Sequence, residues 1–131
     1  MIGDFGPAAN AQLSYPLGIG LSLDHRRLYI ADSGSHRIRM IDISGTNMPQ
    51  GQIVTVAGIM GEYGNSGDNR PATEARLNYP SCVTIDLNDF MWICDRGNNR
   101  IRVVSMRIRV RIPGTNEFES GIIVAAAGNG Q

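Results

Sequence analysis

Two segments of the sequence place acidic, basic and glycine residues at matching positions. Residues 30–43 read IADSGSHRIRMIDI, and residues 93–106 read ICDRGNNRIRVVSM. Charged residues at such spacing could build a catalytic site once, or a structural turn in every copy of a repeat. A turn must be rebuilt in each repeat, whereas a catalytic site need not be. The duplication therefore favours a structural role for the shared polar residues, which are Asp32, Gly34, Arg37, Asp95, Gly97 and Arg100.

These residues predict a strand, a tight turn and a second strand. We expect each aspartate to end the first strand and to accept hydrogen bonds from backbone N–H groups. We expect positive φ at one or both of Gly34 and Gly97, because the turn reverses within three residues. In the second strand, Ile38 and Ile101 should face the packed interior. The flanking arginines should lie on the opposite face, where they pair with aspartates or reach solvent.

Residues suited to metal binding or nucleophilic catalysis are few. The two histidines, His25 and His36, lie in turns on either side of one predicted strand, hence at opposite ends of a sheet. They cannot converge on one metal ion, and we expect both to be exposed. The serines have no histidine and aspartate companions at fixed spacing. We therefore predict no metal, no cofactor and no catalytic activity, and an enzyme site completed by other chains or blades is the alternative.

The two cysteines fall in strands that should form a hairpin centred near residue 88. Cys82 and Cys94 should then face each other across neighbouring strands. Their counterparts in the first half of the chain, Gly18 and Ala31, are both small. We expect the position to demand a small side chain, and the thiols to be reduced and buried.

Self-similarity extends over nearly the whole chain. Residues 4–16 resemble residues 68–80 at an offset of 64, and a VAG or AAG sequence ends each half at Gly58 or Gly128. Each half reads as four short strands preceded by one or two helical turns, which Pro7 and Pro71 would open. Four antiparallel strands per repeat are typical of a β-propeller blade. An eight-strand β-sandwich is the alternative, but it gives no reason for matching turns in each half.

The repeated phrase resembles a known family. The pattern Y-[IW]-x-D-x-G-x-x-R-I-R, with Y-P before it and V-x-V-A-G after it, is similar to the NHL-repeat β-propellers. The segment 61–77 resembles the longer NHL repeats of bacterial proteins and of teneurin-type cell-surface propellers. The resemblance implies an all-β fold of two four-stranded antiparallel blades, blade one at about 1–60 and blade two at about 61–131. A related group of peptidyl-hydroxyglycine lyases uses several histidines, which this chain lacks.

Composition limits the partners. The chain has 12 basic and 12 acidic residues, so its formal net charge is zero. Dedicated nucleic-acid binders usually carry a net positive charge. Five arginines between Arg100 and Arg111 nevertheless keep RNA or another anionic ligand as an alternative partner, against the simpler expectation of a half-buried strand. We find no transmembrane segment and no signal peptide in this sequence, and the compartment stays open.

The predicted binding face consists of the turns at 33–36 and 96–99 and the connection at 59–70. We expect a protein or glycan partner there. Calcium ligation in the connection is weighed against a plain glycine-rich loop, which its irregular acidic spacing favours. The candidate residues of the face are Ser35, His36, Tyr63, Asn65, Asp68, Arg96, Asn98 and Asn99.

Two blades leave two apolar flanks open, so we expect the chain to associate with itself. Joining the last residues of one copy to the first residues of another resembles the internal blade connection, with 10 positions from Gly128 to Pro7 against 13 from Gly58 to Pro71. NHL propellers usually have six blades, so three two-blade chains would close one ring. The expected assembly is a C3 homotrimer, and completion by different blades is the alternative.

Overall fold

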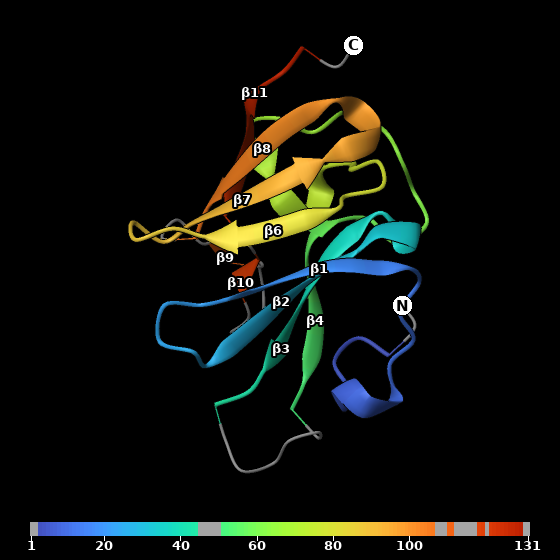
Figure 1. Cartoon of the computed structure of the whole chain (residues 1–131), viewed down its shortest axis with the longest axis vertical. Coiled ribbons are helices and arrows are strands. Elements are labelled where there is room, and N and C mark those ends of the chain that lie inside the picture. The colour runs from blue at the N-terminus through green and yellow to red at the C-terminus, as the bar shows by residue number, and fades with distance from the viewer. Residues whose placement is uncertain (1–2, 45–50, 107–109, 112–117, 120, 130–131) are drawn as a thin grey trace.

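Two antiparallel sheets lie side by side in the computed structural model, which describes residues 3–44, 51–106, 110–111, 118–119 and 121–129 (Figure 1). The first sheet has four strands in chain order. They are β1 (Pro16–Leu21), β2 (Arg27–Asp32), β3 (Arg37–Asp42) and β4 (Ile53–Gly58). All four strands expected from the first half of the sequence are confirmed.

The second sheet has five strands in the order β5-β11-β8-β7-β6. They are β5 (Arg70–Pro71), β6 (Cys82–Ile85), β7 (Phe90–Asp95), β8 (Arg100–Ser105) and β11 (Ile122–Ala127). The two-residue β5 adds a strand to the expected four by pairing with β11. A separate short ladder joins β9 (Val110–Arg111) to β10 (Phe118–Glu119).

Single 3-10 turns occur where the sequence indicated helical turns. They are η1 (Ala8–Asn10) and η3 (Ala72–Glu74), and two more follow β2 and β7 as η2 (Ser33–Ser35) and η4 (Arg96–Asn98). Pro7 and Pro71 directly precede the first two, with the fixed φ that suits a helical start. The all-β fold class is thus confirmed. No helix in the described segments is long and apolar enough to cross a membrane.

The hydrophobic core lies between the two sheets. Tyr29, Ala31 and Ile38 of the first sheet belong to one buried cluster with Val83 and Met91 of the second sheet. The neighbouring strands β1 and β6 approach so closely that a Cβ atom on Gly20 would lie only 2.6 Å from the carbonyl oxygen of Val83. Glycine at this position lets the two sheets pack against each other.

Candidate functional site: the repeated turn and the tyrosine face

The repeated aspartates anchor the segment that enters each innermost strand. Asp32 accepts a hydrogen bond from the backbone N–H of Ser14 at 2.7 Å, and Asp95 accepts one from Asn78 at 2.8 Å. Each aspartate ends a strand, as expected, and both are fully buried. Burial raises the pKa of Asp95, although the N–H of Asn78, the amide of Asn98 and the guanidinium of Arg102 act in the opposite direction.

The glycines of the turn have a different role from the one expected. Positive φ occurs at His36 and Asn99, with values of 58° and 53°, and at neither Gly34 nor Gly97. The expectation of positive φ at these glycines is therefore wrong. Both lie within 3-10 turns, and a Cβ atom on Gly97 would lie 2.5 Å from the carbonyl oxygen of Asn78. Close approach of the backbone excludes a side chain there.

In the first sheet, the arginines of the phrase are buried in an ion-pair cluster. Arg39 contacts Asp4 at 2.6 Å, and Arg37 contacts Asp32 at 3.2 Å, with all four side chains at most 1% exposed. Asp4 also accepts hydrogen bonds from the N–H and hydroxyl of Thr55. The expectation left pairing and solvent exposure open, and the structure shows pairing. Desolvation, followed by the neighbouring Arg39, lowers the pKa of Arg37.

The second sheet repeats this cluster in a more open form. Arg102 contacts Asp68 at 2.8 Å and Asp95 at 3.4 Å, and Arg100 contacts Asp68 at 3.0 Å. Asp68 keeps 26% of its side chain exposed, whereas its counterpart Asp4 is fully buried. These two arginines hold loop residues in place. Their guanidinium groups do not form a free cationic surface.

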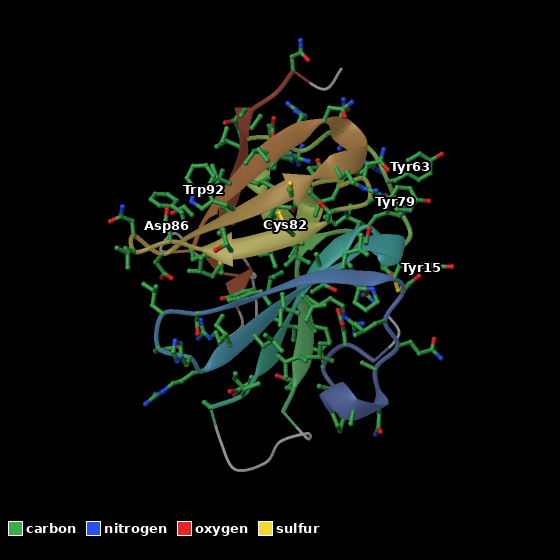
Figure 2. The ribbon with its side chains drawn as sticks, viewed as in Figure 1. Tyr15, Tyr63, Tyr79, Cys82, Asp86 and Trp92 are labelled. Carbon is green, nitrogen blue, oxygen red and sulfur yellow. The ribbon has the colours of Figure 1, made fainter. Side chains whose placement is uncertain are left out.

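An aromatic face forms at the end of the sheets that carries η2. Figure 2 shows Tyr15, Tyr63 and Tyr79 projecting there, and their side chains are 80%, 68% and 47% exposed. The imidazole of His36 lies between two of them, with ring centroids 5.5 Å from Tyr63 and 4.4 Å from Tyr79. We call these four residues the tyrosine face.

His36 is buried, so the expectation of exposure is wrong for this histidine. Its Nδ1 atom accepts a hydrogen bond from the backbone N–H of Tyr79 at 3.1 Å. Desolvation lowers the pKa of His36, and the charge of Asp95 only partly opposes that effect. A neutral imidazole is needed, because a protonated Nδ1 could not accept the hydrogen bond. His25 is exposed, as expected, in the turn at the opposite end of β2.

The other residues of the expected binding face divide into two groups. The exposed group comprises Asn65, Arg96 and Asn99, while Ser35 is half-buried. The structural group is engaged within the fold: Asn98 donates to Gly64 and Asp95, and Asp68 belongs to the second ion-pair cluster. Asn65 is engaged through its backbone carbonyl, which accepts a hydrogen bond from Arg100. The sequence missed Tyr15 and Tyr79. The signal was their shared position before a proline in each repeat.

The opposite end of the sheets contains an open hollow of about 300 Å³. It lies between the β1–β2 turn and the β6–β7 turn. Its lining residues are Ser22, Leu23, Asp24, Arg27, Tyr29, Leu87, Asp89 and Met106. The Ser22 hydroxyl donates to Asp24, and the same carboxylate accepts the N–H of Arg26. These hydrogen bonds stabilise the turn and lower the pKa of Asp24. No histidine is among the described residues that line the hollow, so no imidazole lies between the serine hydroxyl and the carboxylate as in a catalytic triad.

Comparison with known proteins identifies the repeats. The NHL repeat family model matches residues 13–40. NHL repeat-containing protein 2 of Gallus gallus is 30% identical over 106 residues, and its Homo sapiens counterpart is 29% identical over the same length. Both matches cover 80% of this chain. The chain belongs to the NHL-repeat family. The matched model covers β1, β2 and most of β3, and the two antiparallel sheets are consistent with NHL propeller blades.

This NHL chain spans only a small part of its relatives. It covers 14% of the length of NHL repeat-containing protein 2, and 4% of Teneurin-1 of Gallus gallus, to which it is 31% identical over 100 residues. Within the described segments, no group of three histidine, cysteine or acidic side chains is arranged to hold a metal ion. The NHL phrase itself, built around the two ion-pair clusters, is a structural feature of each repeat.

Proposed function

We propose that this NHL unit is a non-catalytic interaction module that docks onto further copies of itself and presents the tyrosine face to a protein or glycan partner. The observation that carries the proposal is a difference in burial between equivalent positions of the two repeats. Side chains covered by the neighbouring sheet in one repeat are open in the other. Three sets of residues support this reading.

The outward flank of the first sheet carries apolar side chains whose counterparts are buried. Ile19 is 68% exposed, whereas Val83 at the equivalent position is 3% exposed against the first sheet. Leu13 is 43% exposed, and its counterpart Leu77 is fully buried. Burying a leucine or isoleucine side chain contributes about 1.5–3 kcal/mol. This flank therefore matches a surface that another blade covers.

The outward flank of the second sheet shows the reverse relation. Trp92 and Ile101 are half-buried, while their counterparts Tyr29 and Ile38 are at most 2% exposed between the sheets. Figure 2 shows Trp92 near the left edge of the second sheet. A second blade placed on this flank would bury these side chains as the second sheet buries those of the first.

The donor and the acceptor of the Tyr79–His36 hydrogen bond also have equivalents on the two outward flanks. Tyr15 is equivalent to Tyr79, with the same φ of 49°, and Asn99 is equivalent to His36. Among the described residues, none accepts a hydrogen bond from the Tyr15 N–H, and the exposed Asn99 side chain offers an amide oxygen. Docking of the two open flanks would bring this donor and acceptor together. A second copy of the chain is thus the occupant we propose.

The proposed contact joins different surfaces of each copy, so it generates a ring when its rotation closes. With two blades per copy, three copies supply the six blades usual for the family, in a C3 homotrimer. The seam between copies must be wider at its innermost strands than the seam within a chain. Within the chain, Gly18 and Gly20 let β6 approach β1 closely. Their equivalents on the outward flank of the second sheet are Cys82 and Thr84, whose side chains would keep the next copy farther away.

Light scattering on the purified chain tests the assembly. We expect three times the chain mass of 14.2 kDa, falling to a single chain mass in Ile19→Asp. Leu87→Asp is the matched control, because Leu87 is 86% exposed at a hairpin tip away from the flank. A monomeric wild-type chain, or a trimer that survives Ile19→Asp, would contradict the proposed seam.

The tyrosine face supports the proposed partner binding. Tyrosine combines a large apolar ring with a hydroxyl group, and exposed aromatic clusters are frequent at interaction sites. We expect Tyr63→Ala to abolish capture of a protein or glycan partner without changing the assembly state. A glycan array and affinity capture, each run with wild type and Tyr63→Ala, distinguish the two ligand classes. Equal binding by both proteins would exclude this face.

The arginine strand does not support the alternative of RNA binding. Arg100 and Arg102 are committed to Asp68 and Asp95, and Arg102 is fully buried. Arg107 and Arg109 lie outside the described residues, as do the side-chain contacts of Arg111. No described feature favours a nucleic-acid partner over the tyrosine face.

A further inference from the structure

The two cysteines form a directly opposed pair in the second sheet. In the β6–β7 ladder, Cys82 is the register partner of Cys94, which confirms that they face each other. Opposed residues of an antiparallel pair have Cα atoms about 4.5–5.5 Å apart, within the range of disulfides of about 4.4–6.8 Å. Their side chains lie on the same face of the sheet, and the two thiols are within hydrogen-bonding reach. Both are free thiols in this structure.

The pair is accessible, contrary to the expectation of burial. Cys82 is exposed and Cys94 is half-buried. Burial alternates along β6, so Val83 faces the first sheet while Cys82 and Thr84 face outward. The counterparts Gly18 and Ala31 lie against the second sheet instead. The expectation failed because, among the described strands, no second sheet packs on the flank that carries the cysteines.

We propose that Cys82 and Cys94 form a reversible dithiol–disulfide site on the outward flank of the second sheet, oxidised by small disulfides of the glutathione class. The inference deepens the proposed function and rests on it in one respect. The same flank is the one that a second copy would cover. The redox state of the pair would then be set while the flank is open, before docking.

The reaction follows thiol–disulfide exchange. The thiolate of Cys82, the more exposed sulfur, attacks one sulfur of glutathione disulfide and releases one glutathione thiolate. The Cys94 thiolate then attacks the Cys82 sulfur and displaces the second glutathione. Two protein thiols are oxidised, one small disulfide is reduced, and the two cysteine protons end in the buffer or on the released glutathione.

The local environment makes this reaction dependent on pH. Desolvation, together with the hydrogen bond to Cys94, raises the pKa of the Cys82 thiol. The thiolate is the attacking species, so its supply increases as pH rises toward that pKa. Oxidation should therefore be faster at pH 9 than at pH 7.

The experiment uses Ile19→Asp, which is expected to keep the flank open, treated with glutathione disulfide at pH 8. We expect loss of both free thiols with no glutathione retained. Cleavage before Asp86 and Asp89, which lie between the cysteines, should leave two fragments joined until a reductant is added. Cys94→Ser is the matched control and should retain one glutathione on Cys82. Unreacted thiols, or glutathione retained on both cysteines, would overturn the dithiol site.

A second measurement separates this site from the assembly. We expect the wild-type trimer to lose its thiols more slowly than Ile19→Asp, because docking covers the flank. A wild-type chain that is monomeric in its reduced form contradicts the proposed seam only. Equal rates of thiol loss in a trimeric wild type and in Ile19→Asp would overturn the placement of the pair on the flank that docking covers.

Discussion

The two ion-pair clusters use the same sequence phrase at different degrees of burial. In the first sheet, Asp4 is fully enclosed between Arg37 and Arg39. In the second sheet, Asp68 retains contact with solvent beside Arg100 and Arg102. In both repeats, the repeated residues therefore form ion pairs that join the loop before the first strand to the second and third strands. How strongly that connection stabilises the fold depends on what covers it, which differs between the two repeats.

The largest effect expected from this comparison concerns the two loop aspartates. Asp4→Asn should lower the free energy of unfolding by about 3–5 kcal/mol, because it leaves buried arginines without their carboxylate. Asp68→Asn should cost about 1–2 kcal/mol, between the ranges for exposed and buried pairs. Urea denaturation of both variants measures the difference. Equal losses would show that burial does not distinguish the clusters.

A second prediction concerns the glycines that both repeats need for close packing. Gly97→Ala should cost about 1–3 kcal/mol, as expected for a side chain forced into occupied space. Asn78→Ala should rescue little of this loss, because the backbone oxygen of Asn78 is among the nearest atoms at 2.5 Å. Ser14→Ala should relieve Gly34→Ala more, because the nearest atom there is the Ser14 hydroxyl. Thermal unfolding of the single and double variants tests this order, which equal rescue in both pairs would contradict.

The strands could be predicted from the sequence because alternation and turn residues are local signals. The ion-pair clusters could not, although Asp4 and Asp68 match each other and the arginines do too. Their pairing joins residues 35 and 34 positions apart, and only the fold brings them together. The left-handed positions also repeat, as at Phe5 and Asn69. Asparagine favours this region, whereas phenylalanine does not, so the residue type signals only the second of the two.

The candidate site was only partly predictable for the same reason. Residue types placed His36 and Tyr63 on the binding face, and the structure brings their rings together. The sequence did not indicate that Asn98 and Asp68 are held within the fold, because their partners lie in other loops. Exposure of the cysteines depended on which flank a neighbouring sheet covers, and local patterns carry no information about that.

The smallest effect expected concerns the hydrogen bond between the sheets. The folded-state pKa of His36 is lowered, so the unfolded chain binds more protons between that value and the ordinary value of about 6.5. The stability that neutral His36 contributes is therefore complete above about pH 6.5 and is lost as pH falls toward the folded-state pKa. His36→Asn should remove this dependence while keeping an acceptor for the Tyr79 N–H, since asparagine occupies the equivalent left-handed position at Asn99. His25→Asn is the control, because His25 also has positive φ but lies in an exposed turn. Urea denaturation between pH 5 and pH 8 should give a smaller slope for His36→Asn than for wild type and His25→Asn, and three equal slopes would show that the His36 hydrogen bond does not depend on a neutral imidazole.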